Sequence, residues 1–362
     1  MNAAPGRAWV HAMIARLEQE AARSADTHLL RVDLPAWPGI PLYFKDEAAH
    51  PTGSLKHRLA RSLFLYALCN GRLREGQGVI DASSGSTAIS EAWFARLLGL
   101  RFVAVAPADT APAKLRLLRS LDAECLEIPA GADGCAIARA RAEADGLCYL
   151  DQFGLAERAT DWRGNNNIAE SIVAQMAREP DPVPRWIVCG AGTGGTSATI
   201  GRYLRLRRLD TGLCVADTTG GGFARGWSGR GDGPARPTLL EGIGRPRVEP
   251  GFLFDVVDAV EEVDDDESIA AMRLLSGLLG HRYGGSSGTV FAACLRLAER
   301  MRAHGERGPI VTLLGDRGDR YAETLFDDAW LQAHGVDPAP ATARLRQRLA
   351  RRDRIAAGPM PS

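Results

Sequence analysis

Short apolar runs of strand length alternate with segments of helical spacing along most of this 362-residue chain. "GVIDA" at 78–82, "RFVAVAP" at 101–107 and "ECLEIP" at 124–129 are such runs, and helical patterns such as "AISEAWFARLLGL" at 88–100 separate them. The same rhythm continues as far as "PIVTLLGD" at 309–316. Strands that alternate with helices usually pair in parallel and are covered by those helices. The pattern therefore predicts a doubly wound α/β fold.

The composition argues against several classes of function. Lys+Arg and Asp+Glu are both 44, so no net charge indicates nucleic acid or an anionic membrane as a partner. The seven cysteines are scattered without a C-x-x-C pair, which is typical of a reducing cytoplasm, and the seven histidines show no metal-ligand spacing. No apolar run could span a bilayer, and the first residues lack the apolar core of a signal peptide. We expect a cytoplasmic enzyme with a small-molecule substrate and no metal.

A glycine-rich stretch follows one of the apolar runs. Gly190, Gly192 and Gly195 form G-x-G-x-x-G, and Asp217 lies at about the distance of the acid that binds a ribose in dinucleotide sites. However, bare N–H groups at a helix N-terminus suit any phosphate. The stretch alone leaves NAD and another phosphate ligand equally open.

Two more turns are rich in serine and lead into helices. They are "DASSGSTAIS" at 81–90 and "YGGSSGTVF" at 283–291. Their hydroxyl and N–H groups could bind an anion, although such a turn more often only caps its helix. Together with the glycine turn at 192–196, they indicate a ligand with two negative ends, or a substrate and a cofactor that each carry one.

Lysine is rare in this chain. Of the 44 basic residues only Lys45, Lys56 and Lys114 are lysines, and arginine cannot supply a neutral amine. In "HPTGSLKHR", at 50–58, Lys56 stands at the start of a mainly apolar helix, where the helix dipole and partial desolvation lower the pKa of the amine. A lowered pKa is what an amine needs to form a Schiff base. On composition alone, a surface cation remains the alternative for each lysine.

Taken together, these motifs resemble the fold-type II pyridoxal-phosphate (PLP) enzymes, the cysteine synthase and cystathionine β-synthase family, over about residues 25–325. The resemblance implies two doubly wound α/β domains with the cofactor in the cleft between them, and a homodimer. The implied division is a large PLP-binding domain at 1–45 and 160–330, a small substrate-side domain at 46–159, and a C-terminal helix and tail at 331–362.

The resemblance also assigns roles to single residues. "SLKHR" makes Lys56 the catalytic lysine, which binds the cofactor covalently. "GTGGT" supplies the phosphate cup and "GGSSGT" the partner of the pyridine nitrogen, so the cofactor-binding residues would be Lys56, Ser86, Gly192, Thr193, Gly194, Gly195, Thr196 and Ser286. "SSGST", "LDQF" and "EGIG" would bind the substrate through Ser83, Ser84, Gly85, Thr87, Gln152 and Gly242.

Two departures from the family's motifs narrow the range of activities that we expect. Ser86 stands where the family has an Asn that contacts the cofactor, and His57 stands where it has an Asp. With "DWRGNNNIAES" at 161–171, they resemble the bacterial L-cysteine desulfhydrases, which would convert L-cysteine to hydrogen sulfide, pyruvate and ammonia. The alternatives are a cysteine synthase, an NAD-dependent oxidoreductase that uses 190–195 and Asp217, and a catalytically silent binding partner, against which the retained Lys56 argues.

Three segments outside these motifs carry structural predictions. The Gly-, Arg- and Pro-rich segment 218–238 indicates a long mobile loop. The acidic run Asp264 to Glu267 is interpreted as first-turn charge on a helix and not as a metal site. From about 331 onward we expect a surface helix and a frayed tail.

Overall fold

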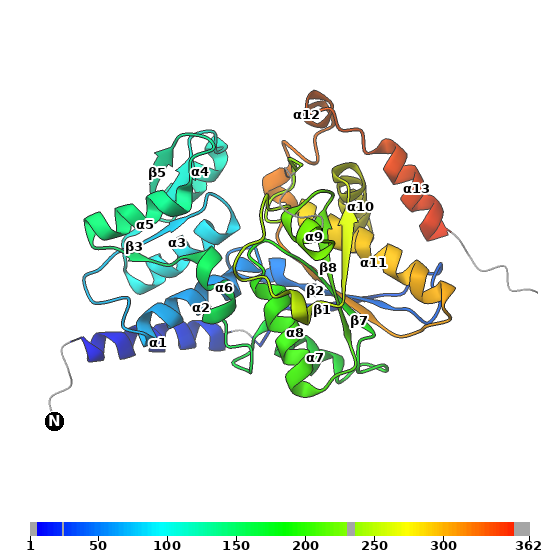
Figure 1. Cartoon of the computed structure of the whole chain (residues 1–362), viewed down its shortest axis with the longest axis horizontal. Coiled ribbons are helices and arrows are strands. Elements are labelled where there is room, and N and C mark those ends of the chain that lie inside the picture. The colour runs from blue at the N-terminus through cyan, green and yellow to red at the C-terminus, as the bar shows by residue number, and fades with distance from the viewer. Residues whose placement is uncertain (1–5, 24, 230–235, 351–362) are drawn as a thin grey trace, which may run out of the picture.

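A computed structural model describes residues 6–23, 25–229 and 236–350 of the chain. It contains two sheets, each accompanied by its own helices (Figure 1). The larger sheet has six strands in the order β1-β2-β10-β7-β8-β9, in which β1 is antiparallel to β2 and all other neighbours are parallel. Its strands are β1 His28–Val32, β2 Leu42–Asp46, β7 Trp186–Gly190, β8 Gly212–Thr218, β9 Ala259–Val263 and β10 Ile310–Leu314.

The smaller sheet has four parallel strands in the order β5-β4-β3-β6. They are β3 Val79–Ala82, β4 Phe102–Pro107, β5 Glu124–Ile128 and β6 Cys148–Tyr149. Parallel neighbours need a crossover between them, and the helical segments of the sequence supply it. The predicted α/β fold class is confirmed.

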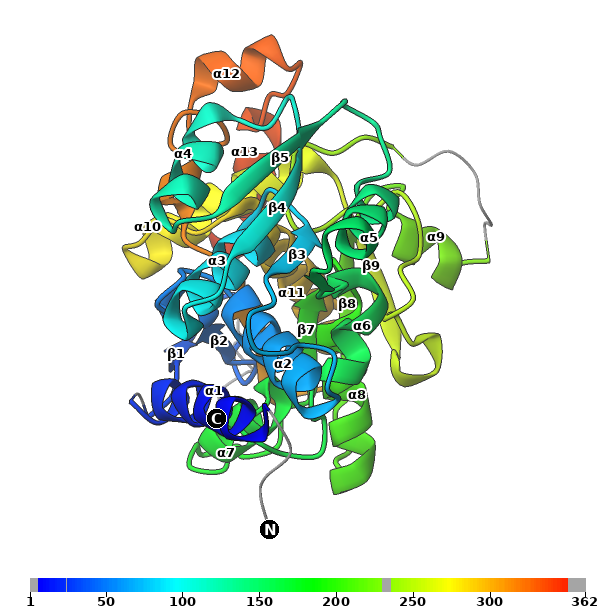
Figure 2. The same ribbon diagram turned by 90° about the vertical axis from the view of Figure 1, so that its left-hand side faces the viewer.

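Helices α1 to α6 accompany the smaller sheet, and the later helices accompany the larger one (Figures 1 and 2). The first group is α1 Arg7–Ala22, α2 Lys56–Cys69, α3 Ser86–Leu98, α4 Pro112–Ser120, α5 Gly134–Asp145 and α6 Gln152–Ala159. The second group is α7 Ile168–Met176, α8 Gly195–Arg207, α9 Gly222–Trp227, α10 Asp265–Leu279, α11 Gly285–Ala303, α12 Asp328–Ala333 and α13 Ala339–Ala350. Short 3-10 turns are η1 Glu47–Ala49, η2 Phe254–Val256 and η3 Gly318–Tyr321.

The larger sheet is buried on both faces. Along β8, Leu213 and Val215 belong to one apolar cluster, while Cys214 and Ala216 belong to another on the opposite face. Successive side chains of a strand point to opposite faces, so a strand covered on both sides is apolar without alternation. This is why the sequence shows continuous apolar runs here.

Helix α1 packs on α2 and α3. Its Met13 and Leu17 lie in the same buried cluster as Phe64 and Phe94, so the first helix belongs to the layer around the smaller sheet. The resemblance had instead assigned residues 1–45 to the large domain. The division into domains at the expected boundaries stays a prediction.

Part of the segment 218–238 is helical, contrary to the prediction. The mobile-loop prediction is wrong at Gly222–Trp227, which form α9 because the buried Asp217 carboxylate accepts the N–H of Ala224. Residues 230–235 lie outside the described part of the chain. The acidic run does form the first turn of α10, as expected.

The C-terminal helix is attached to the core. Helix α13 packs on α10, and its Ala341 and Leu345 are buried. The expected tail at 351–362 lies outside the described residues. Among the helices that the structure describes, none has both the length and the apolar character to cross a membrane.

Candidate active site

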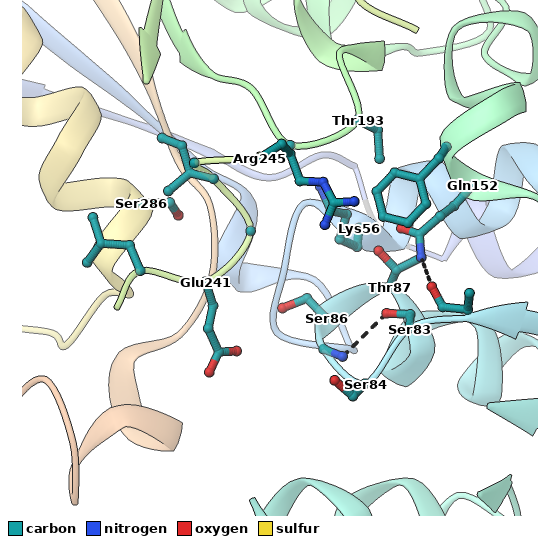
Figure 3. Close-up of a pocket in the computed structure, with 18 of the residues that line it drawn as sticks. Lys56, Ser83, Ser84, Ser86, Thr87, Gln152, Thr193, Glu241, Arg245 and Ser286 are labelled. Atoms are coloured by element: carbon teal, nitrogen blue, oxygen red, sulfur yellow. Dashed lines mark hydrogen bonds between the residues drawn. The ribbon is translucent and has the colours of Figure 1, made fainter. Parts of the chain in front are cut away.

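A cavity of about 800 Å³ lies between the two sheets, at the carboxyl ends of their strands. Ligands of open α/β sheets bind at this edge. Of the residues to which the resemblance assigns a role, those that line the cavity are Lys56, Ser83, Ser84, Gly85, Ser86, Thr87, Gln152, Gly192, Thr193, Gly194, Thr196, Gly242 and Ser286, and Figure 3 labels several of them. Gly195 lines a small neighbouring cavity instead. The structure thus brings together motifs that are more than 200 residues apart in the chain.

Lys56 begins α2 and reaches the cavity between the two sheets. A Cβ atom on Gly192 would lie 3.7 Å from Lys56 Nζ and 2.4 Å from the Gly242 carbonyl oxygen, so the amine faces these two glycines closely. Burial lowers the pKa of Lys56; the Asp316 carboxylate opposes this and the Arg245 guanidinium adds to it. The amine is therefore easier to deprotonate than an ordinary lysine.

The glycine turn leads from β7 into α8 and leaves no room for a side chain at Gly192 or Gly194. Gly194 has a φ of +83°, and a Cβ there would lie 2.4 Å from the Phe252 backbone nitrogen. Gly195 opens α8, with Thr193 beside it. Exposed N–H groups at the start of a helix, with the positive end of its dipole, form an anion cradle.

Asp217 decides against the dinucleotide interpretation of this turn. Its carboxylate is fully buried and accepts the backbone N–H groups of Thr218 and Ala224 at 2.9 and 3.1 Å. Burial raises its pKa to about 6 in spite of these hydrogen bonds. A carboxyl group engaged in capping α9 is not available to a ribose hydroxyl, so the sequence spacing was misleading.

The serine loop at 83–87 opens α3. Ser83 Oγ accepts the N–H of Gly85 at 3.3 Å (Figure 3). It also accepts the N–H of Ala88 at 3.3 Å and so caps the helix. Ser86 Oγ accepts a hydrogen bond from Arg320 Nη1 at 3.0 Å. The helix N-terminus and the remaining hydroxyls still face the cavity, which makes the loop a second anion cradle.

Gln152 is buried beside this loop and is held by two hydrogen bonds. Its Nε2 donates to the Ala82 carbonyl at 2.9 Å (Figure 3), and its backbone N–H donates to Asp81 Oδ2 at 3.1 Å. Asp81 and Glu91 are both fully buried. Burial raises the pKa of Asp81 to about 6, and burial with the neighbouring Asp81 charge raises the pKa of Glu91 well above 4.5. The Asp81 carboxylate thus holds the backbone of Gln152 in place.

Ser286 lies on the opposite wall, in the first turn of α11 (Figure 3). A Cβ on Gly315, just after β10, would lie 3.0 Å from Ser286 Oγ. The next residue, Asp316, is buried and accepts a hydrogen bond from the Tyr321 hydroxyl at 2.7 Å. Burial raises the pKa of Asp316.

His57 does not reach the cavity. Its Nε2 lies 3.2 Å from Glu20 Oε1 and its Nδ1 3.3 Å from Thr52 Oγ1, and its ring stacks on His50. Burial lowers the pKa of His57. This histidine ties α1 to the start of α2, a structural role. In the described part of the chain no group of three or more His, Cys, Asp or Glu side chains could hold a metal.

The sequence assigned no role in the site to several charged residues that lie in or beside the cavity. Arg245 lines it beside Gln152, and an ion pair between Lys114 and Glu241 joins α4 to the segment opposite. Arg245 directly follows "EGIG", and Arg320 lies just beyond β10. The only indication in the sequence was that each arginine closely follows a segment already predicted, the EGIG motif or the last strand.

Comparisons with known proteins agree with this geometry. A family model described as "Pyridoxal-phosphate dependent enzyme" matches residues 24–316. The chain is 55% identical to the L-cysteine desulfhydrase of Mycobacterium tuberculosis, over 94% of each protein. It is 30% identical to a putative cysteine synthase of Sinorhizobium fredii, over 87% of this chain and 92% of that protein. The crystal structure of O-ureido-L-serine synthase superposes with a TM-score of 0.73 at 28% identity, covering 84% of this chain and 96% of that one.

The cavity fits pyridoxal phosphate chemically. The cofactor carries an aldehyde, a phosphate and a ring nitrogen. Around one cavity the structure offers the amine of Lys56, a turn at 192–196 whose glycines exclude side chains, and the hydroxyl of Ser286. A Cβ at Gly192 would overlap the backbone of Gly242, and a Cβ at Gly194 would overlap the backbone of Phe252.

Proposed function

Because the chain belongs to the family of pyridoxal-phosphate dependent enzymes, we propose that it is an L-cysteine desulfhydrase, which cleaves L-cysteine into hydrogen sulfide, pyruvate and ammonia. The observation that carries the proposal is the position of Lys56. Its amine lies in a cavity between the anion cradle at 192–196 and the serine loop at 83–87. The 55% identity to the mycobacterial desulfhydrase supports cysteine as the substrate.

The proposed roles follow the positions in the cavity. Lys56 binds the cofactor covalently, and the remaining cofactor contacts come from Ser86, Gly192, Thr193, Gly194, Gly195, Thr196 and Ser286. The substrate contacts come from Ser83, Ser84, Gly85, Thr87, Gln152 and Gly242. The serine loop receives the carboxylate of the amino acid, because its N–H groups open α3.

When bound, pyridoxal phosphate supplies an electron sink that weakens the bond between Cα and its proton. Lys56 Nζ takes up this proton, and its lowered pKa keeps the amine ready to do so. The serine loop and Gln152 hold the substrate carboxylate so that Cα faces Nζ. Ser286 offers the ring nitrogen a neutral hydroxyl, which favours loss of the β-substituent over transamination.

A cysteine synthase is the second candidate, favoured by the putative cysteine synthase among the relatives. The two activities share the loss of the β-substituent and differ in the next step, which is hydrolysis in one and addition of sulfide in the other. We further propose a cytoplasmic homodimer. All seven cysteines are unpaired, which suits a reducing compartment, and light scattering of the purified protein tests the dimer.

The test is to supply the purified holoenzyme with L-cysteine, and separately with O-acetylserine and sulfide. We expect sulfide and pyruvate in equal amounts from L-cysteine, and little cysteine from O-acetylserine. Efficient cysteine formation with little pyruvate would establish the synthase instead. If the enzyme forms neither pyruvate nor cysteine, both candidate functions are contradicted.

A further inference from the structure

A hydrogen bond joins Arg320 to Ser86, a residue of the cavity. Arg320 lies in η3, just beyond the last strand of the larger sheet, and Ser86 opens α3 beside the smaller sheet. Nη1 of the arginine donates to Ser86 Oγ at 3.0 Å. Ser86 lines the cavity (Figure 3), whereas Arg320 is not one of the described residues that line it. The guanidinium therefore reaches the serine without being part of the cavity surface.

This hydrogen bond determines what the Ser86 hydroxyl can do. A guanidinium has only donors, so Ser86 Oγ is the acceptor and its own proton remains free to be donated. In the part of the chain that the structure describes, no group accepts that proton; Ser90 Oγ binds the backbone carbonyl of Ser86 instead. A hydroxyl that accepts from a charged donor also becomes a better donor, because consecutive hydrogen bonds polarise one another. Ser86 is thus prepared to donate to a ligand in the cavity.

The backbone of the segment after β10 is held in place next to Lys56. The N–H of Arg317 donates to the Gly53 carbonyl at 3.0 Å, and the N–H of Leu55 donates to the Gly315 carbonyl at 2.9 Å. The segment that carries the guanidinium and the segment that carries the amine therefore hydrogen-bond to each other. Their relative positions are fixed before any ligand binds, so little conformational entropy remains to be lost.

The charge of Arg320 is not neutralised by an ion pair with any residue that the structure describes. The guanidinium does act on Asp316, where it opposes the rise in pKa that burial causes. That carboxylate is already hydrogen-bonded by the Tyr321 hydroxyl at 2.7 Å. The positive charge beside Ser86 is therefore available to strengthen the hydrogen bond to its oxygen.

The cofactor offers an acceptor in the right direction. On the ring of pyridoxal phosphate, the carbon that carries the aldehyde stands between the carbon that bears the phosphate arm and a carbon that bears an oxygen. The amine of Lys56 lies between the turn at 192–196 and the serine loop at 83–87. If the aldehyde is at Lys56 and the phosphate at the glycine turn, the ring oxygen is on the side of the serine loop.

We propose that Arg320 is a positioning residue for the cofactor: by donating to Ser86 Oγ, it directs the Ser86 proton to the ring oxygen of pyridoxal phosphate. The inference rests on the proposed contact between Ser86 and the cofactor. It goes beyond that contact, because it assigns the direction and strength of the contact to a residue outside the cavity surface. The effect of Arg320 on the cofactor should pass through one side chain and depend on one oxygen.

The test measures the affinity of the cofactor-free full chain for pyridoxal phosphate and for its 3-deoxy analogue, which lacks the ring oxygen. Titration followed by visible absorbance gives both affinities. We expect Arg320→Gln to bind pyridoxal phosphate about tenfold more weakly than the wild type, which corresponds to about 1.4 kcal/mol. Arg320→Lys keeps a charged donor and should lose less. The analogue should bind to the wild type and to Arg320→Gln equally.

A double-mutant cycle shows whether the arginine acts through the serine. Ser86→Ala removes the hydroxyl, so adding Arg320→Gln to it should weaken binding of pyridoxal phosphate no further. The matched control is Arg317→Gln. This neighbouring arginine donates to the Ala48 carbonyl and is not one of the described residues that line the cavity, so its loss should leave both affinities unchanged.

The outcomes separate a positioning role from a structural one. Equal losses of affinity for pyridoxal phosphate and for the analogue in Arg320→Gln, or losses that add to those of Ser86→Ala, overturn the inference. Unchanged affinity for pyridoxal phosphate in Arg320→Gln overturns it as well. If circular dichroism shows that Arg320→Gln is unfolded, Arg320→Lys decides, since it should lose affinity only for pyridoxal phosphate. The proposed function is judged separately, by whether the wild type forms sulfide from L-cysteine.

Discussion

Replacing Gly194 by alanine tests whether the turn at 192–196 depends on a bare backbone. Gly194 has a φ of +83°, a conformation that costs an L-residue about 1–2 kcal/mol. The new Cβ would also lie 2.4 Å from the nitrogen and 2.6 Å from the Cα of Phe252. These are backbone atoms, so no rotation of a side chain relieves the overlap.

The two effects add. Overpacking in a closely packed region costs about 1–3 kcal/mol, so the total destabilisation is roughly 2–5 kcal/mol if the turn stays in place. If the turn moves instead, its N–H groups no longer converge on one point, and each 1.4 kcal/mol of lost interaction weakens phosphate binding about tenfold. We expect a cofactor affinity at least tenfold lower together with reduced stability.

Gly99→Ala is the matched control. Gly99 ends α3 with a φ of +72°, but a Cβ there has no neighbour within 4 Å, so only the conformational cost remains. Urea unfolding of the cofactor-free variants measures stability, and titration followed by visible absorbance measures cofactor affinity. If Gly194→Ala loses no more stability than Gly99→Ala and binds the cofactor like the wild type, the turn is not the phosphate cup.

Three further predictions concern other parts of the cavity. Borohydride reduction and peptide mapping should find the pyridoxyl group on Lys56, and a label on Lys45 or Lys114 would remove the central assignment. The raised pKa of Glu91 means that the folded state keeps a proton which the unfolded state releases above 4.5, so this group's contribution to stability falls as pH rises. Urea unfolding should therefore show Glu91→Gln gaining stability relative to the wild type between pH 5 and pH 8, and parallel pH profiles would refute this. Ser86→Asn should raise the ratio of cysteine formed from O-acetylserine to pyruvate formed from cysteine, because a longer side chain offers more hydrogen bonds to the cofactor. An unchanged ratio would show that Ser86 does not control this balance.

The sequence predicted the elements that carry strong local signals. Continuous apolar runs predicted most strands of both sheets, but not the two-residue strand β6, and turns rich in glycine or serine predicted the starts of α3, α8 and α11. It did not predict β9, whose sequence "AVEEV" is only partly buried at the edge of the sheet. It also missed α9, because a glycine-rich segment shows no helical pattern until Asp217 caps it.

The same Asp217 shows why a motif needs its surroundings. In the sequence its spacing from Gly190 matched a ribose-binding acid, and only burial and hydrogen bonding reveal that it organises α9. Helix α9 in turn holds the backbone of Arg245 and Pro246. Asp217, whose spacing suggested a dinucleotide site, thus helps through α9 to hold the Arg245 guanidinium on the cavity wall. The spacing of motifs can predict which groups meet at a ligand when those groups stand at the starts of adjacent helices. A charged side chain such as that of Arg245 is positioned by a series of hydrogen bonds, and these produce no recognisable pattern in the sequence.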